Sequence, residues 1–229
     1  MKQCETLRAG GSVEWTPEQA AAFLRAQTLE QVRAGVEAAQ REPQPLTPES
    51  LNGILTRYGG NFGIWALFTR IVAACKVTPA AFASGLADAY TIGQADRKTA
   101  LLLFQHANPR QIMNADDLAV FEGFPVRLTV YRGCGADEPA AGVFGLSWTL
   151  SRAVAEFFAW RFNAADTGRV VVSTQVTRPD VLAYFNTRRE QEIICNVEAG
   201  PSQPVDVIAR EPSALYWDYM NRNKNAAAV

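Results

Sequence analysis

Four polar side chains in the second half of the chain have the types and the order of a reaction site. Arg132 stands in a Val-Tyr-Arg-Gly segment, Ser147 in Leu-Ser-Trp-Thr, and the pair Glu190 and Glu192 in Arg-Glu-Gln-Glu-Ile-Ile. Each segment lies on or beside an apolar run that is typical of a strand, so a guanidinium group, a hydroxyl and two carboxylates are expected to meet in one cleft. This combination suits chemistry on an anionic sugar phosphate, since arginine binds phosphate oxygens bidentately.

The spacing of the two glutamates predicts how they are presented. On a strand over residues 190–197, Glu190 and Glu192 point to one face, because strand side chains alternate. The same pattern also fits an exposed edge strand on which the glutamates pair with Arg188 and Arg189. A short motif in isolation favours this ordinary alternative. Its occurrence together with the other two motifs favours a site.

Strands must position these side chains, and the second half of the sequence has strand periodicity. Residues 126–131 alternate apolar and polar side chains, and Gly133 and Gly135 are expected to end this strand. Ser151 has the type and position of a cap before a largely apolar helix, whereas residues 178–189 are expected to form a loop. Further strands are expected at residues 142–148, 169–176, 190–197 and 205–209, and a short aromatic helix at residues 212–223.

The first half of the chain is expected to be helical. Thr16, Thr47 and Thr78 are each followed by proline, which places a capping hydroxyl directly before a residue suited to the first helical turn. The apolar residues that follow recur at helical spacing. We therefore predict an α+β protein, in which a helical amino-terminal lobe over residues 1–120 precedes a mixed or antiparallel β-core over residues 121–229.

Composition favours a packed, enzyme-sized globule, and the net charge argues against some classes of binding partner. The chain has 229 residues, of which 48% are hydrophobic, and a formal net charge of −1. A charge so near neutral provides no overall attraction to nucleic acid or to a membrane surface. The sequence has neither the apolar centre of a signal peptide nor a stretch that could span a bilayer, so we expect a cytoplasmic protein.

The sulfur and imidazole groups do not predict a metal site. Cys4, Cys75, Cys134 and Cys195 form no Cys-x-x-Cys pair, and His106 is the single histidine of the chain. These residues do not make up a usual zinc set. We expect reduced thiols and chemistry without a metal.

Three segments in order, residues 130–133, 146–151 and 190–192, resemble the mono-ADP-ribosyltransferases of the Arg-Ser-Glu class. That family has Ser-Thr-Ser as its middle motif where this chain has Ser-Trp-Thr, so a tryptophan departs from the pattern. The resemblance implies a β-sandwich core over residues 121–229 that binds NAD, behind the helical lobe. It also implies an activity, the transfer of ADP-ribose from NAD to an acceptor with release of nicotinamide.

The resemblance implies a role for each of the four polar residues. The Glu192 carboxylate stabilises the positive charge that develops on the ribose when its bond to nicotinamide breaks, as in glycoside cleavage, and Ser147 orients that carboxylate. Arg132 braces the site and contacts the nicotinamide-side phosphate or ribose. Its ordinary structural role, a buried scaffold ion pair, is also part of the role that the resemblance implies. Glu190 binds the guanidinium of a protein arginine and assists the removal of its proton.

Further residues are implied in binding the two substrates. For NAD, Gly133 lets the backbone approach the nicotinamide amide, Thr149 supplies a second hydroxyl, and Phe158 or Phe162 offers a stacking surface. For the acceptor, the predicted loop presents aromatic rings and a cation, namely Tyr184, Phe185 and Arg189. Ordinary packing explains the aromatic residues as well.

Two other functions are open at this point. Arg178, Arg188 and Arg189, with the aromatic residues of the loop, would suit RNA or DNA as the acceptor of ADP-ribose, as in an intracellular toxin, although the near-neutral charge weighs against it. Alternatively, the chain binds NAD or a protein partner, such as an antitoxin, without catalysis. The tryptophan within the serine motif is the best support for that reading.

Overall fold

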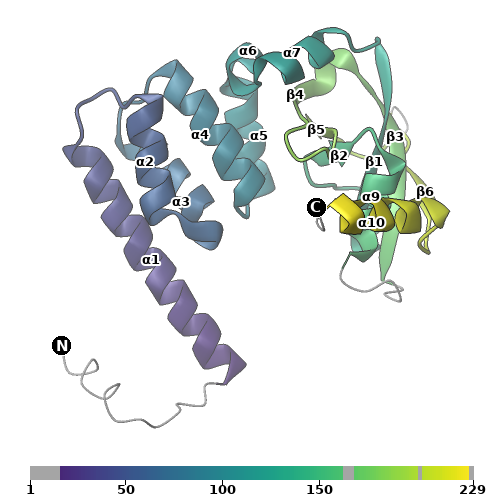
Figure 1. The fold of residues 1–229 in the computed structure, drawn as a ribbon, viewed down its shortest axis with the longest axis horizontal. Helices are drawn as coiled ribbons and strands as arrows, with labels where there is room; N and C mark the ends of the chain where they lie inside the picture. The colour runs from purple at the N-terminus through teal and green to yellow at the C-terminus, as the bar shows by residue number, and fades with distance from the viewer. Residues whose placement is uncertain (1–15, 162–167, 201–202, 227–229) are drawn as a thin grey trace.

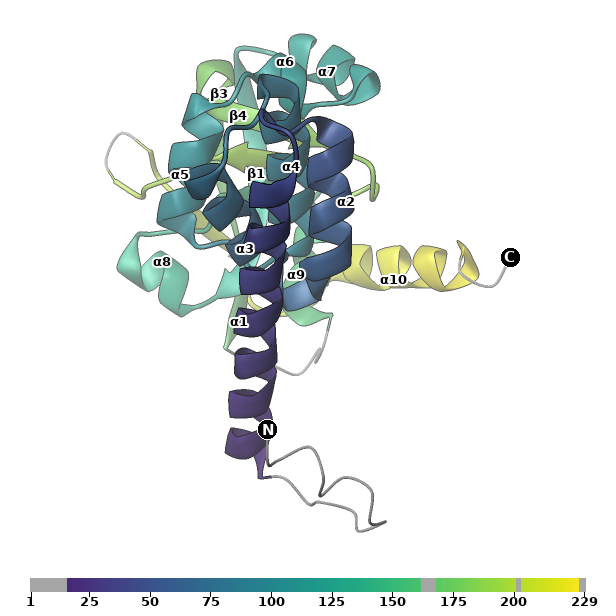
Figure 2. The same cartoon turned by 90° about the vertical axis from the view of Figure 1, so that its left-hand side faces the viewer.

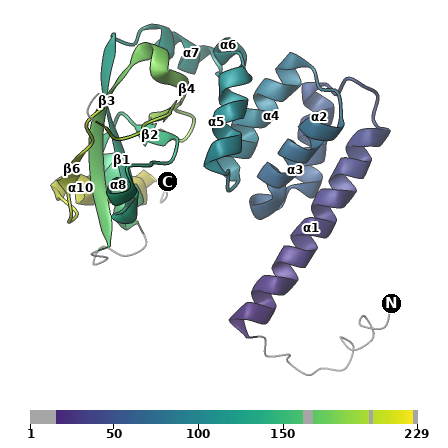
Figure 3. The same cartoon turned by 180° about the vertical axis from the view of Figure 1, so that it is seen from behind.

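Helices and strands occupy separate parts of the chain in this computed structural model, which describes residues 16–161, 168–200 and 203–226. The helices before the first strand are α1 (Pro17–Arg41), α2 (Pro48–Tyr58), α3 (Gly60–Ala74), α4 (Pro79–Ile92), α5 (Arg97–His106), α6 (Pro109–Ile112) and α7 (Ala115–Glu122). Figure 1 shows α1–α5 on one side of the molecule and the sheet on the other, and the view from behind agrees (Figure 3). The predicted order, helices first and antiparallel strands second, is confirmed.

Threonine–proline pairs start α1, α2 and α4, as predicted. The Thr47 hydroxyl accepts a hydrogen bond from the backbone N–H of Ser50, and the Thr78 hydroxyl accepts one from that of Ala81. Each bond satisfies a backbone donor that the first helical turn leaves unpaired. The helix boundaries in this half therefore follow from local sequence.

The helical bundle gives firm support to α4, which lines the site described below. Phe68 of α3 and Leu86 of α4 are fully buried in its core. The long α1 packs through its second half, where Val32 is buried, whereas Leu24 in its first half is exposed. Figure 2 shows the first turns of α1 extending beyond the other helices. No helix among the described residues is both long and apolar enough to cross a membrane.

Within the described ranges, six strands join edge to edge in one antiparallel sheet. They are β1 (Arg127–Gly135), β2 (Ser147–Thr149), β3 (Arg169–Thr177), β4 (Val181–Phe185), β5 (Glu192–Cys195) and β6 (Asp206–Ala209). Their order across the sheet is β4-β5-β2-β1-β3-β6. These strands thus form a single sheet, where the family resemblance implied a β-sandwich.

Two helices in the second half cover one part of this sheet. Ser151 caps α9 (Arg152–Trp160), as predicted, and Ala155 and Ala159 pack toward β1 and β3. The final helix, α10 (Ala214–Ala226), lies against α9. The buried carboxylate of Glu156 accepts hydrogen bonds from the backbone and the hydroxyl of Ser213, which holds the start of α10 to α9.

The first two strands differ from their predicted bounds. β1 ends at Gly135, as predicted, but Gly133 and Cys134 still pair with β3 and belong to the strand. The predicted strand over residues 142–148 is shorter in the structure, because β2 begins only at Ser147. Before it, Val143 makes an isolated bridge to Glu198. The short helix α8 (Asp137–Ala141) stands between them. The strands predicted at 169–176 and 205–209 and the final helix are confirmed.

The segment predicted as a loop over residues 178–189 contains a strand. Arg178–Asp180 form a 3-10 turn, β4 follows, and only the remaining residues connect to β5. Val181, Ala183 and Tyr184 are buried, which explains why this segment pairs with β5. β5 itself begins at Glu192, two residues later than predicted.

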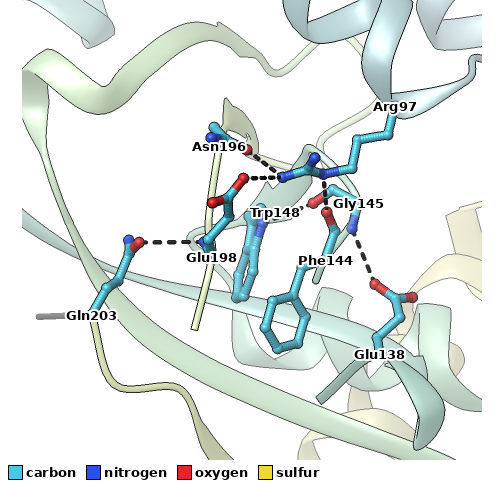
Figure 4. A network of polar contacts seen from close by, with 8 residues as sticks. All are labelled: Arg97, Glu138, Phe144, Gly145, Trp148, Asn196, Glu198 and Gln203. Carbon is cyan, nitrogen blue, oxygen red and sulfur yellow. Dashed lines mark hydrogen bonds and ion pairs between the residues drawn. The ribbon is translucent and has the colours of Figure 1, made fainter. Parts of the chain in front are cut away.

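The helices and the sheet share a core and a polar contact. Leu146, Ala183 and Ile194 belong to the same buried cluster as the helical bundle, and α7, which contains the predicted boundary at residue 120, packs on β4. Figure 4 shows the guanidinium of Arg97, from α5, between two segments of the sheet region: its Nε donates to the carbonyl oxygen of Phe144 at 2.8 Å. The bundle therefore contacts the segment that leads into β2.

Candidate active site

A buried carboxylate beside a hydroxyl forms the centre of the site. Glu192, the first residue of β5, is paired with Thr149 of β2 and is 8% exposed. Ser147 lies two residues from Thr149, on the same face of β2. Its hydroxyl donates a hydrogen bond to Oε1 of Glu192. The pairing of β2 with β5 thus brings together two of the predicted site residues.

Burial controls the ionisation of Glu192. It raises the pKa of this carboxyl above its ordinary value, because a charge is poorly solvated inside the protein. The hydrogen bond from Ser147 and the positive charge of Arg188 lower the pKa, whereas the charge of Glu190 raises it further. Any cationic centre that binds beside Glu192 would favour its ionised form.

The Glu190 side chain also lies near Glu192, but it extends from a bend in the backbone and not from a strand. Arg189 and Gln191 have φ values of 59° and 47°, the left-handed region that residues other than glycine rarely adopt. Arg188 Nη2 nevertheless lies 2.9 Å from Glu190 Oε2 and 3.8 Å from Glu192 Oε2. The two carboxylates therefore converge, as the sequence predicted, although strand alternation is not the cause.

Hydrogen bonds to the backbone hold this bend. The Thr149 hydroxyl donates to the carbonyl oxygen of Glu190 at 2.6 Å and accepts from the N–H of Ser151 at 3.0 Å. The N–H of Gln191 donates to the side-chain oxygen of Asn186. Burial raises the pKa of the Glu190 carboxyl, and the charge of Arg188 opposes that rise. Thr149, predicted to contact NAD, uses its hydroxyl to position Glu190.

Arg132 is braced by a carboxylate that the sequence analysis missed. Its Nε and Nη2 donate to the two oxygens of Glu138 at 2.8 and 3.0 Å, and its Nη1 donates to the carbonyl oxygen of Ser147 at 2.7 Å. Each nitrogen of the Arg132 guanidinium thus makes one hydrogen bond, and the pair with Glu138 is the scaffold ion pair described for it in the sequence analysis. The acidic start of α8, directly after the strand that carries Arg132, was the available signal.

Gly145 completes this scaffold. Its N–H donates to Glu138 Oε2 at 3.1 Å, and its carbonyl oxygen accepts from the indole N–H of Trp148 (Figure 4). A Cβ atom at position 145 would lie 2.5 Å from Arg132 Nη2, so glycine leaves the room that the guanidinium occupies. Trp148, the departure from the family motif, is 2% exposed and points into the core, away from Ser147 and Thr149.

A cavity of about 290 Å³ opens beside Glu192, between β1, β2 and α9. Its lining includes all four residues that opened the sequence analysis, together with Gly133, Thr149 and Phe158. Two cations that were not assigned a role, Arg161 and Arg169, also line it. The Arg161 guanidinium lies 4.9 Å from the centre of the Phe158 ring, three residues earlier, a spacing at which helical side chains are neighbours.

Two of the remaining residues predicted to bind NAD, Phe158 and Gly133, lie at the cavity. Phe158 lines the cavity, whereas Phe162 lies outside the described residues. Gly133 also borders the cavity, but a Cβ atom there would lie 2.1 Å from the carbonyl oxygen of Ala155 in α9. The absent side chain of Gly133 therefore makes room for α9, and the contact of its backbone with nicotinamide stays a prediction.

The residues predicted to face the acceptor separate into three environments. Tyr184 is 3% exposed and packs edge-on against Phe124 at 5.3 Å, so the prediction of an exposed aromatic platform was wrong for this ring. Phe185 is half-buried and lines a second cavity together with Glu190 and Glu192. Arg189 is exposed, and no ion pair among the described residues involves its side chain.

The helical lobe supplies the other walls of the site. Asp88 and Thr91 of α4 line the second cavity, and Tyr90 and Arg97 line a third, which reaches Ser147 and Arg132. Arg188 and Glu192 border all three cavities. No sequence motif predicted a role for these helices in the site, because their lining residues lie far from the three motifs in the chain.

The arrangement can stabilise a cationic centre next to an anionic group. Glu192 and Glu190 supply negative charge in the lining of the first cavity, and Arg161 and Arg169 supply positive charge there. Among the residues that the structure describes, no group of three or more His, Cys, Asp or Glu side chains is arranged to hold a metal ion. Comparisons with protein-family models, curated proteins and solved structures find no match to this chain.

Proposed function

We propose that this chain is a mono-ADP-ribosyltransferase, which transfers ADP-ribose from NAD to an arginine of a protein and releases nicotinamide. The observation that carries the proposal is the hydrogen bond from Ser147 to the buried Glu192, beside the Arg132–Glu138 ion pair and in the wall of a cavity with further cations. The residues that resemble the Arg-Ser-Glu class thus meet in one place.

The donor side of the cavity has charges that suit a dinucleotide. NAD carries a negatively charged pyrophosphate, and arginine is the side chain best suited to bind phosphate oxygens bidentately. Arg161 and Arg169, which line this cavity, are the candidates for that contact. The Phe158 ring offers an apolar surface in the same cavity.

Glu192 would supply the main catalytic effect. When the bond between the ribose and nicotinamide breaks, positive charge develops on the ribose ring, and a nearby carboxylate lowers the energy of that state. The Glu192 carboxylate is mostly shielded from water, which strengthens this attraction. Ser147 would keep the carboxylate in one orientation through its hydrogen bond.

The second cavity favours a cationic acceptor over a nucleic acid. Its lining includes the carboxyl groups of Asp88, Asp117, Glu190 and Glu192 and one cation, Arg188. A surface of this kind attracts the guanidinium of a substrate arginine and repels the phosphates of RNA or DNA. Glu190 would bind the acceptor guanidinium and take up its proton.

Nicotinamide release from NAD by the purified full chain tests the proposal. Glu192→Gln keeps the shape of the side chain and removes its charge, so we expect release to fall about 10²–10³-fold. Glu30→Gln is the matched control, because Glu30 is exposed on α1, far from the cavity, and this variant should release nicotinamide at the wild-type rate. Near-wild-type release by a folded Glu192→Gln protein would refute the assignment.

The acceptor is tested separately with labelled NAD. Incubation with cell-lysate protein, with RNA and with DNA should transfer the label to protein arginine. Label found in nucleic acid alone would overturn the arginine acceptor while leaving the donor chemistry intact. Consumption of no NAD, combined with tight binding of a cellular protein, would instead identify a non-catalytic binding domain.

A further inference from the structure

Arg188 occupies the place that the proposed reaction requires of an acceptor. Its Nη2 lies 2.9 Å from Glu190 Oε2 and 3.8 Å from Glu192 Oε2. The residue borders both the first cavity, where NAD is proposed to bind, and the acidic second cavity. Its Nη1 donates to the carbonyl oxygen of Thr91 in α4, at 3.4 Å. An arginine of the chain itself is thus positioned between the two carboxylates.

We propose that Arg188 is a site of self-modification, which accepts ADP-ribose from NAD bound in its own active site. This inference rests on the proposed function, and it adds an acceptor within the chain. The side chain is 49% exposed, so a product at this position would have room to extend into solvent.

The step needs no reagent beyond NAD. The Arg188 guanidinium gives the proton on Nη2 to Glu190, and the freed electron pair forms a bond to the anomeric carbon of the ribose. The bond between that carbon and the nicotinamide nitrogen breaks, and nicotinamide leaves with the bonding electrons. Glu192 faces the positive charge of the ribose during the exchange. Proximity favours this reaction, because the nucleophile is already held in the site.

The neighbouring arginine is a built-in control. Arg189 has the same side chain one position later, but its guanidinium makes no ion pair with either glutamate in the described part of the chain. If exposure and loop position were sufficient for modification, Arg189 should be modified as readily as Arg188. If contact with the carboxylates is required, Arg188 alone of the two should react.

The experiment incubates the purified full chain with NAD and no other acceptor, and follows both nicotinamide release and the mass of the protein. We expect the mass to rise by one ADP-ribosyl group, which peptide fragmentation assigns to Arg188. The rate per molecule should not change with protein concentration, because the reaction is intramolecular. Arg188→Lys should lose the label, and Arg189→Lys should keep it.

The outcomes separate this inference from the function on which it rests. Nicotinamide release with Arg188 unmodified would overturn self-modification and leave the transferase proposal standing. Absence of both release and label would overturn the transferase proposal and this inference with it. When the wild type is mixed with Glu192→Gln, label on Arg188 of the variant would show transfer between molecules and refute the intramolecular reaction.

Discussion

The two halves of the candidate site hold their charged groups by different means. On the β1–β2 side, Arg132 and Glu138 form an ion pair. Gly133 packs closely on the backbone of α9, and Gly145 packs closely on the guanidinium of Arg132. On the side of the bend before β5, Glu190 follows a residue with a left-handed backbone and faces the half-exposed Arg188. The first half is a rigid scaffold, whereas the second consists of a loop held by a few hydrogen bonds.

This difference matches the demands of the proposed reaction. The donor in such a reaction is always NAD, so a preorganised scaffold can be matched to it. The acceptor is a side chain that must enter and leave, and a loop allows that exchange. Damage to the scaffold should therefore abolish folding and activity together, and damage to the bend should mainly affect transfer to the acceptor.

The largest effect is expected from Gly133→Ala in the scaffold. The added Cβ would lie 2.1 Å from the carbonyl oxygen of Ala155 and 2.5 Å from the N of Ala159, and neither backbone group can yield without moving α9. We expect a loss of at least about 3 kcal/mol in the free energy of unfolding, measured by urea denaturation. Gly53→Ala in α2 is the control, since no atom lies within 4 Å of its added Cβ.

In the exposed middle of a helix, alanine should stabilise the protein by about 0.5–1 kcal/mol relative to glycine. The two Gly→Ala changes thus have opposite expected signs. Equal stability of the Gly133→Ala protein and the wild type would mean that α9 does not pack on β1 as closely as described.

A smaller effect is expected from Thr149→Val in the bend. Valine keeps the shape of threonine but loses the hydrogen bonds to Glu190 and Ser151, so Glu190 is held less firmly. We expect the loss of these hydrogen bonds to cost roughly 1.4 kcal/mol in the orientation of Glu190, which corresponds to a factor of about ten in rate. Transfer to an arginine acceptor should therefore fall about tenfold relative to nicotinamide release. The ratio of the two rates is the measurement.

Thr174→Val provides the matched control for the bend. The Thr174 hydroxyl is also buried and donates to a backbone carbonyl, that of Pro204 at 2.7 Å, but it lies beside another cavity of the sheet. This variant should lose stability without a change in the ratio of transfer to release. An unchanged ratio in Thr149→Val would show that the hydroxyl does not position Glu190.

The smallest effect concerns pH. Burial raises the pKa of Glu192 above its ordinary value of 4.5, so the folded protein holds this proton at pH values where the unfolded chain has lost it. The resulting stabilisation is complete below pH 4.5 and is lost as the pH rises through the raised pKa. Urea denaturation across this range should therefore show a weaker pH dependence in Glu192→Gln than in the wild type.

Activity should change in the opposite direction, because the reaction needs the ionised carboxylate. The kcat/KM for nicotinamide release, which depends on ionisation of the protein before NAD binds, should fall as the pH drops through the raised pKa of Glu192, with a midpoint above 4.5. A midpoint at or below 4.5 would mean that the Glu192 carboxyl is not shielded from water before NAD binds.

Local sequence was sufficient for much of the fold. Threonine–proline pairs predicted the starts of α1, α2 and α4, and Ser151 predicted the start of α9, because capping depends on residues within one helical turn. The alternation of apolar and polar residues over 126–131 predicted the first strand, because neighbouring side chains on a strand point to opposite faces. The sequence also indicated that Arg132, Ser147 and the two glutamates belong to one site, through their order along the chain.

Tertiary structure alone decided how these residues meet. The packing of α9 on Gly133 and the burial of Tyr184 depend on residues from other elements, and no local pattern contains that information. The same holds for the bend that turns Glu190 toward Arg188, and for the wall contributed by α4. Residue types set the available chemistry, whereas contacts between distant segments determined which groups are free to carry it out.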